Sequence, residues 1–272
     1  MTERPPNLRP PPTLPTDGFN EVVMCRIGPL LFNRHDQYVG ASLRKYGEFS
    51  PGEAELFRQL VPQGAVVIEV GANIGAHTVE LSKLAGPSGM VIAFEPQRVV
   101  FQTLCANLAL NSCANVHAFP FAIGAEPGDI TVPFLAPDQP NNFGGLSLIG
   151  ATVGEKVALH VLDALQVPHC ALIKLDLEGM EVEALRGGAN LIARHRPVLY
   201  VENDRVERAD ELTGLLRSWN YRLYAHTPPL FAPENFAGDP ENIFGTIVSI
   251  NLLCLPAERG ITVNGLREIG PT

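Results

Sequence analysis

The sequence predicts an α/β protein built on a doubly wound, mostly parallel sheet, and three observations lead to this prediction. Residues 66–70 (VVIEV) form a continuous, largely β-branched run, which is typical of a strand buried on both faces of a parallel sheet. Strand-like apolar runs then alternate along the chain with segments of helical periodicity. The 272 residues are 46% hydrophobic and 18% charged, which is enough for one large domain with a sizeable core.

The N-terminal part precedes this alternation. Residues 1–18 hold six prolines and few apolar side chains, so we expect a disordered, Pro-rich tail. Residues 19–60 are expected to form a lead-in of short strands and turns that ends in a helix over 51–60. That helix begins with Ser50-Pro51-Gly52-Glu53, the pattern of a capping box. Residues 19–272 are then expected to fold as a single domain.

The alternating part of the chain begins at residue 66. Strands are expected at 66–70, 90–94, 116–123, 171–177, 197–201, 221–225 and 246–255. Helices are expected between them at 75–85, 97–111, 181–194 and 210–219. Residues 128–165 interrupt the pattern with two strand-like segments, 130–135 and 156–162, around a Gly/Asn loop. We expect this β-rich insertion to serve either dimerisation or cover of a substrate.

Composition and charge exclude several classes of function. Acidic residues outnumber basic ones 29 to 20, a net charge of −9, which argues against a nucleic-acid partner. No apolar run approaches the roughly 20 residues that span a bilayer, and no secretion signal opens the sequence. Five scattered cysteines without a C-x-x-C pair predict neither a disulfide framework nor a zinc ribbon. We therefore expect a cytoplasmic protein that binds no membrane.

The sharpest motif is Glu69-Val70-Gly71-Ala72-Asn73-Ile74-Gly75, which runs from the first buried strand into a helix. Gly71 allows a tight turn, and Gly75 allows the helix to start close to the sheet. The first turn of that helix offers free backbone N–H groups. Twenty residues beyond Gly75, Glu95 ends the next strand, where a carboxylate accepts both hydroxyls of a ribose. Together these features predict a ligand that contains adenosine.

The same loop distinguishes between adenosine-containing cofactors. Asn73 stands where a dinucleotide-binding loop has the second glycine, which admits a pyrophosphate. Glu69 repels a pyrophosphate but suits a cation, and S-adenosylmethionine has a sulfonium, an ammonium and no phosphate. The favoured prediction is an S-adenosylmethionine-dependent methyltransferase. A nicotinamide-dependent oxidoreductase and a non-catalytic, nucleoside-binding partner subunit are the alternatives.

Six segments resemble the FkbM family of S-adenosylmethionine-dependent methyltransferases. They are 66–78 (VVIEVGANIGAHT), 93–96 (AFEP), 107–111 (NLALN), 173–181 (IKLDLEGME), 196–202 (RPVLYVE) and 251–256 (NLLCLP). The resemblance covers roughly residues 36–256. It implies the Rossmann-like, seven-stranded sheet of class I methyltransferases, with an antiparallel last strand, and methylation of a hydroxyl on a small molecule, sugar or natural product.

The resemblance also implies a set of cofactor-binding residues. Glu69, Gly71, Asn73 and Gly75 would line the methionine end, and Glu95 would hold the ribose. Thr78 and Pro96 lie in the same matching segments and are counted with this site. Many class I enzymes have a polar residue near the end of the third strand, whereas residues 119–122 are apolar here. The adenine is therefore expected to pack on apolar groups, with Phe121 among them.

The predicted catalytic residues follow the fourth parallel strand. Alternation places Lys174, Asp176 and Glu178 on one face of this strand end, where open α/β sheets bind ligands. We hypothesise that Asp176, with Glu178, positions or deprotonates the acceptor hydroxyl, and that His226 is a second-choice base. Alternatively, Asp176 only holds the cofactor and Glu178 caps the next helix. Lys174 needs a buried partner, and Glu69 or Glu202 is expected to supply it.

Two further sites are predicted from position. Asp176, Glu202 and Asn203 offer oxygen ligands that suit Mg²⁺, and they resemble the metal site of divalent-dependent O-methyltransferases. Substrate contacts are expected from Tyr38 and Asn142, whose side chains suit hydroxyl-rich ligands, and from Phe143, which would stack on a ring. The expected partner is thus a small-molecule or saccharide hydroxyl.

Overall fold

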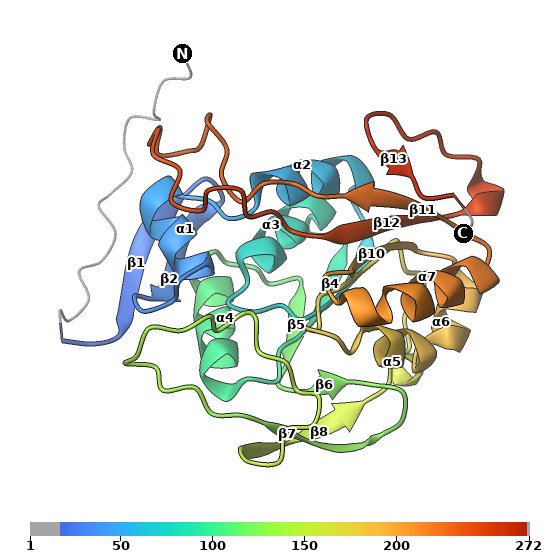
Figure 1. Cartoon of the computed structure of the whole chain (residues 1–272), viewed down its shortest axis with the longest axis horizontal. Helices are drawn as coiled ribbons and strands as arrows, with labels where there is room; N and C mark the ends of the chain where they lie inside the picture. The colour runs from blue at the N-terminus through green and yellow to red at the C-terminus, as the bar shows by residue number, and fades with distance from the viewer. Residues whose placement is uncertain (1–16, 271–272) are drawn as a thin grey trace.

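An eight-stranded sheet runs through the protein in the computed structural model, which describes residues 17–270 (Figure 1). The strand order is β13-β11-β12-β10-β9-β3-β4-β5. Almost all of the predicted tail, residues 1–18, lies outside the described residues.

Five neighbouring strands of this sheet are parallel. They are β3 (Val66–Val70), β4 (Met90–Phe94), β5 (Val116–Phe119), β9 (Leu172–Leu175) and β10 (Val198–Glu202). The strand β12 (Asn251–Pro256) runs antiparallel to β10 and to β11 (Tyr221–His226). The Rossmann-like, seven-stranded sheet with an antiparallel last strand is therefore confirmed. A two-residue strand, β13 (Arg267–Glu268), adds an eighth member at the edge, which the sequence did not predict.

Helices cover both faces of the sheet because its strands alternate apolar side chains between two sides. On one side, Val67, Val91 and Tyr200 pack with Phe57 and Leu81. This side carries α2 (Pro51–Leu60), α3 (Ala76–Ala85) and α4 (Arg98–Leu110). The other side carries α5 (Glu181–Arg186), α6 (Ala189–His195) and α7 (Ala209–Ser218). Figure 1 shows the second group together on the right.

The lead-in and the insertion flank this core. The lead-in contains an antiparallel hairpin, β1 (Asn20–Cys25) and β2 (Gly28–Asn33), followed by α1 (Val39–Tyr46). Its apolar side chains pack against α4. The insertion forms a separate three-stranded sheet of β6 (Ala122–Ile123), β7 (Gly128–Val132) and β8 (Glu155–His160). The expected β-rich insertion is thus confirmed, and it lies at the bottom of Figure 1.

Three short 3₁₀ helices complete the described elements. They are η1 (Leu162–Ala164), η2 (Val206–Arg208) and η3 (Ala257–Arg259). None of the helices in residues 17–270 has the length and apolarity to cross a membrane.

Several predicted elements are divided or shortened. The single strand expected over 116–123 breaks at Pro120, because proline has no N–H to continue the ladder. Its second half joins the small sheet as β6. The helix expected over 181–194 breaks at Gly187, where a Cβ would lie 2.0 Å from the carbonyl oxygen of Gly124. The last strand begins at Asn251 rather than at residue 246.

The helix α2 has the predicted bounds, but its predicted capping box is wrong. Ser50 adopts a left-handed conformation with φ 41°, and its side chain caps no backbone N–H. Its hydroxyl instead donates to Glu53 Oε1 at 2.8 Å. Both residues are buried, so Glu53 belongs to the interior rather than to the helix surface.

The packing of α4 yields a stability prediction. Leu104 is fully buried and faces Gly75, where a Cβ would lie 2.7 Å from Leu104 Cδ1. Leu104→Ala should lower the free energy of unfolding by about 2–5 kcal/mol, because it leaves a cavity that cannot fully collapse. Leu110→Ala, at a 42% exposed position of the same helix, should cost about 0.5 kcal/mol or less. Urea denaturation measures the free energy of unfolding of both variants. Equal losses would contradict the packing of α4 against Gly75.

Candidate active site

A polar cleft opens where the strand order reverses, at the carboxyl ends of β3, β9 and β10. The chain proceeds from β3 to β4 and β5 on one side and returns to β9 and β10 on the other. Open α/β sheets bind ligands at such a position. The walls of the cleft come from the β3–α3 loop, the ends of β9 and β10, the helix α2, the insertion loop and the segment before β12.

The β3–α3 loop is shaped by close backbone contacts. Gly71 has φ 81°, and a Cβ there would lie 1.9 Å from the carbonyl oxygen of Asp176. Asn73 has φ 50°, and its Oδ1 accepts a hydrogen bond from the N–H of Ile74 at 2.7 Å. The Asn73 amide also lies against Gly144 of the insertion loop. The side chain of Asn73 therefore fills the space that a glycine would leave open for a pyrophosphate.

Two buried carboxyl groups flank this loop. Glu69, on β3, has a buried Oε2 without a hydrogen-bond partner among the described residues, and the buried hydroxyl of Thr78 has none either. Glu95 accepts the backbone N–H of Asn73 at 2.9 Å and that of Gln97 at 2.8 Å. Burial raises the pKa of each of the two carboxyl groups to about 7.

A smaller cavity continues from the cleft toward Glu95. It is lined by Glu95, Pro96 and Gln97 on one side and by Leu146 and Leu148 of the insertion on the other. The cleft and this smaller cavity share the backbone around Gly71, together with Asn73, Gly144, Asp176 and Glu178. The two spaces together form one elongated site that passes across the tip of β3.

Lys174 supplies the positive charge of the cleft. Its Nζ donates to Asp176 Oδ2 at 3.0 Å, so the expected pairing with Glu69 or Glu202 is wrong. Although burial lowers the pKa of Lys174, the charges of Asp176, Glu69 and Glu53 raise it more, and the ammonium stays ionised. Glu69 is its register neighbour on β3. Lys174 therefore balances several carboxylates while donating to one of them.

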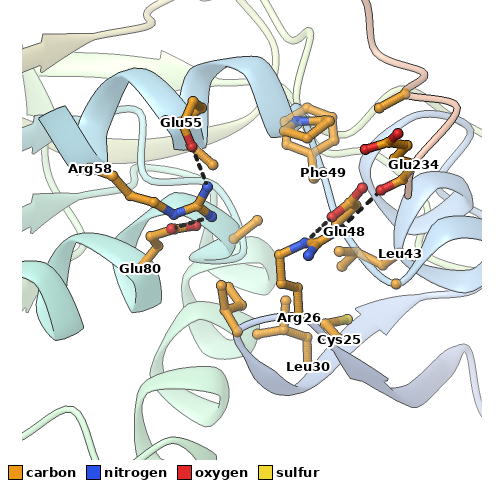
Figure 2. A pocket seen from close by; sticks show the side chains of 16 residues that line it. Cys25, Arg26, Leu30, Leu43, Glu48, Phe49, Glu55, Arg58, Glu80 and Glu234 are labelled. Carbon is orange, nitrogen blue, oxygen red and sulfur yellow. Dashed lines mark hydrogen bonds and ion pairs between the residues drawn. The ribbon is translucent and has the colours of Figure 1, made fainter. Parts of the chain in front are cut away.

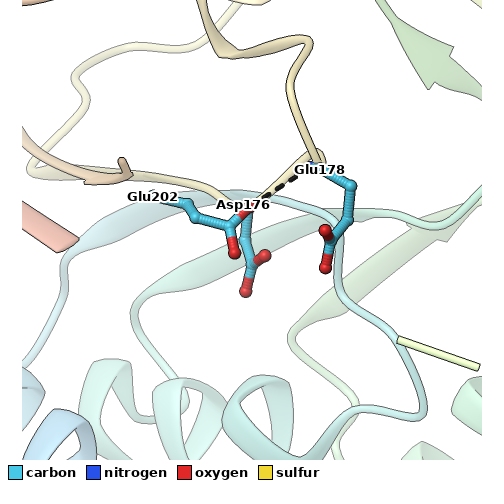
Figure 3. A group of neighbouring side chains, drawn as sticks. All are labelled: Asp176, Glu178 and Glu202. Atoms are coloured by element: carbon cyan, nitrogen blue, oxygen red, sulfur yellow. Dashed lines mark hydrogen bonds between the residues drawn. The ribbon is translucent and has the colours of Figure 1, made fainter. Parts of the chain in front are cut away.

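Three carboxyl groups converge beside Lys174. Oxygens of Asp176, Glu178 and Glu202 all lie within 4.8 Å of one another, and Figure 3 shows the side chains pointing to the same side. Burial, followed by the charge of Asp176, raises the pKa of Glu178 to about 8 and that of Glu202 to about 11. Burial and the neighbouring carboxylates therefore favour the protonated form of Glu202, whereas the guanidinium of Arg205 opposes the rise at Glu178.

This cluster revises two predictions. Asp176 and Glu202 converge as expected, but Glu178 takes the third position and Asn203 does not line the cleft. Oxygen ligands of this kind suit Mg²⁺, which remains a prediction. Glu178 does not cap α5 either: it binds Arg205, while Glu181 accepts the N–H groups of Leu177 and Gly179.

Sequence reasoning missed two residues of the opposite wall. Glu53 of α2 and His77 of α3 both line the cleft, with 3.6 Å between Glu53 Oε2 and His77 Nε2. Burial raises the pKa of Glu53 and lowers that of His77 to about 3, so this imidazole is neutral. The position of His77 in the first turn after the glycine loop was the available signal. Glu53 was interpreted as part of a capping box and therefore not as a residue of the site.

The predicted substrate residues have different outcomes. Tyr38 and Asn142 line the cleft, as expected. Phe143 does not: it is 5% exposed and packs in the core with the apolar side chains of α4. Its carbonyl oxygen accepts a hydrogen bond from the side chain of Gln97 at 2.7 Å.

Four other predicted residues lie behind the walls. His226 lines neither cavity; its Nδ1 lies 2.8 Å from the Tyr200 hydroxyl, and its register partner Asn251 faces the cleft instead. Phe121 stacks on Phe119 and His160 and also lines neither cavity. Thr78 is fully buried and lines neither cavity, and Gly75 contacts α4.

Comparisons with known proteins find methyltransferases. The family model described as the methyltransferase FkbM domain matches residues 69–223. Methyltransferase 1 of Beauveria bassiana is 26% identical over 148 residues, which cover 46% of this chain and 59% of that protein. Hexuronic acid methyltransferase AglP of Haloferax volcanii is 28% identical over 145 residues, covering 52% and 58%. The chain thus spans about three fifths of the length of these curated relatives.

Solved structures show a weaker likeness. The crystal structure of methyltransferase FkbM from Methylobacillus flagellatus KT is 17% identical, with a TM-score of 0.45. The match covers 74% of this chain and 50% of that one.

The charge balance around Lys174 generates a prediction. Lys174→Met should lower the free energy of unfolding by about 3–5 kcal/mol at about pH 8, because buried carboxylates lose their cation. Glu69 holds its proton more tightly in the folded state, with a pKa of about 7 against a reference of 4.5. Ionising Glu69 in the folded protein therefore lowers the free energy of unfolding as the pH rises from 4.5 to about 7. The loss of stability caused by Lys174→Met should accordingly be smaller at about pH 5 than at about pH 8.

Urea denaturation at both pH values measures the difference. Lys156→Met, at an exposed position on β8, is the matched control and should change little at either pH. A deficit for Lys174→Met that did not depend on pH would mean that the residue acts by packing alone.

Proposed function

The chain belongs to the methyltransferase FkbM family, and we propose that it transfers a methyl group from S-adenosylmethionine to a hydroxyl of a small molecule or saccharide. The observation that carries the proposal is the unpartnered Oε2 of Glu69, buried in the cleft beside the Gly71 turn. A buried carboxylate oxygen without a partner is costly, and a cationic ligand removes that cost.

The residues present fit this cofactor. Glu69, Gly71 and Asn73 would hold its methionine end at the cleft, and Glu95 and Pro96 would hold its ribose in the adjoining cavity. When bound, S-adenosylmethionine supplies an electrophilic methyl group on a sulfonium. Asn73 continues to argue against a nicotinamide dinucleotide, because its side chain lies where a pyrophosphate needs open space.

Asp176 is the proposed base or positioning group for the acceptor. It lies where the two cavities meet, and Lys174 fixes its carboxylate at 3.0 Å. The acceptor hydroxyl would donate a hydrogen bond to this carboxylate and pass its proton to it. Glu202, whose pKa is raised to about 11, and Glu178, which is bound to Arg205, are less available to accept that proton.

The charge of the cleft favours an uncharged acceptor. Lys174 is the cationic side chain among the described residues of its lining, and it is already engaged by Asp176. The carboxyl groups of Glu53 and Asp176 would repel an anionic substrate. The relative from Haloferax volcanii is named for a hexuronic acid. We propose that this chain instead takes a neutral hydroxyl compound, oriented by Tyr38 and Asn142.

Ligand binding gives the first test. S-adenosylmethionine and S-adenosylhomocysteine, each at about 100 times its Kd, should add about 2.7 kcal/mol of stability. For a domain of this size that is a rise in Tm of about 5–10 °C. NAD should leave the Tm unchanged. Stabilisation by NAD alone would favour an oxidoreductase. No rise in Tm with either sulfur compound would rule out S-adenosylmethionine as the cofactor.

The variant Glu69→Gln tests whether Glu69 contacts the cofactor, through the pH dependence of S-adenosylmethionine affinity. Affinity for S-adenosylmethionine should rise as the pH increases through about 7 in the wild type, because Glu69 ionises there. The variant should lose the part of that dependence that comes from Glu69, while the part that comes from Glu95, whose pKa is also about 7, remains. Glu207→Gln, at an exposed position, should retain the full dependence.

Asp176→Asn tests the chemical step. It should lower kcat with a neutral hydroxyl acceptor by about 10²-fold or more, because the proton acceptor is gone. The Kd for S-adenosylmethionine should stay within about threefold. Release of S-adenosylhomocysteine reports kcat, and Asp129→Asn on the exposed side of β7 is the control. Equal losses in kcat and affinity would show that Asp176 only holds the cofactor.

A further inference from the structure

A second cavity lies next to the cleft, between the β1–β2 turn, the end of α1, and the helices α2 and α3 (Figure 2). Its volume is about 210 Å³, whereas a single water needs about 10–15 Å³. Phe49 and Ala76 line both spaces and form the partition between them. The second cavity is therefore large enough for a small molecule and separate from the proposed site of methyl transfer.

Its walls combine apolar surface with two groups of ion pairs. Leu30, Leu43 and Ala54 line it, and all three are buried. Figure 2 shows Arg58 with the carboxylates of Glu55 and Glu80 on one side, and Arg26 with the carboxylate of Glu48 and the backbone carbonyl of Glu234 on the other. Such a space suits a ligand with an apolar body and one polar group.

The polar feature of this cavity is the carboxylate of Glu48. Its side chain is 7% exposed, and its Oε2 accepts a hydrogen bond from Arg26 Nε. Its Oε1 is buried and has no partner among the described residues. Arg26 cannot serve both oxygens easily, because its Nη2 donates to the carbonyl oxygen of Glu234 at 3.3 Å. One buried acceptor is thus left for a donor from outside the chain.

The charge balance selects the kind of donor. Four carboxylates line the cavity against two guanidinium groups, and both guanidinium groups are already bound to carboxylates. Burial, with the charge of Glu48, raises the pKa of Cys25 to about 12, so this lining thiol stays neutral and is no nucleophile. A ligand that brings a positive charge is therefore favoured over a neutral or anionic one.

We propose that this second cavity binds a small amine with an apolar body, whose ammonium group donates to Glu48 Oε1. The site is independent of the methyl-transfer chemistry proposed above. It differs from the cleft in its walls, which come from the lead-in and from the outer sides of α2 and α3.

Calorimetric titration of the full chain with 2-phenylethylamine tests the proposal, with 3-phenylpropionate as a probe of similar shape and opposite charge. The amine should bind saturably and the carboxylate should not. Glu48→Gln should weaken amine binding at least about tenfold, since it removes the charge that faces the ligand. Glu55→Gln, which removes a 62% exposed carboxylate at the rim, should leave the Kd within about twofold.

Two further variants keep the test decisive. Ala54→Leu fills the cavity without touching an ion pair, and it should abolish amine binding even if Glu48→Gln folds poorly. Glu53→Gln removes a carboxylate of the cleft and should leave amine binding unchanged. Loss of binding in Glu53→Gln but not in Glu48→Gln would place the amine in the cleft and overturn the proposal.

Saturating S-adenosylhomocysteine separates this proposal from the proposed function. The Kd of the amine should be the same with and without it. Equal binding of both phenyl probes, or no saturable binding of the amine at millimolar concentration, would overturn the amine site. The rise in Tm with S-adenosylmethionine tests the proposed function and does not depend on these results.

Discussion

The buried ammonium group of Lys174 is the interaction on which the site depends. It lies in the middle of the sheet, where β9 meets β3, and it donates to Asp176 while its charge also reaches Glu69 and Glu53. Without this cation, three carboxyl groups at the ends of adjacent elements would face each other in a medium that solvates charge poorly. The position of Lys174 in a central strand thus allows an acidic cleft to exist at the switch point.

Burial raises the pKa values of the carboxyl groups in this cleft, so its negative charge depends on pH and on bound cations. The pKa values of Glu69 and Glu95 are raised to about 7, that of Glu178 to about 8 and that of Glu202 to about 11. Except at Glu178, which is already paired with Arg205, much of this negative charge therefore develops only when a cation enters and stabilises it. A cationic cofactor would both bind to the cleft and draw protons from its walls, which couples cofactor affinity to pH.

The two halves of the site come from different parts of the chain. The loop and strand ends around Glu69, Glu95 and Asp176 lie within residues 69–223, which match the family model. Tyr38 and Glu53, on the opposite wall, precede that match, and Asn251 follows it. The second cavity is also built largely from the lead-in. The segment that matches the family model thus forms the proposed cofactor side, while segments outside that match contribute Tyr38, Glu53 and Asn251 to the opposite wall.

The sequence by itself determined the sheet, the Gly71 turn and the positions of Glu95 and Asp176, because these depend on local patterns and on the rule that parallel strands end at one edge. Only the tertiary structure decided which side chains face the cleft. Phe143 and His226 turn away from it, and Glu53 turns into it. Burial and pKa depend on contacts between residues far apart in the chain, and such contacts leave no periodic signal in the sequence.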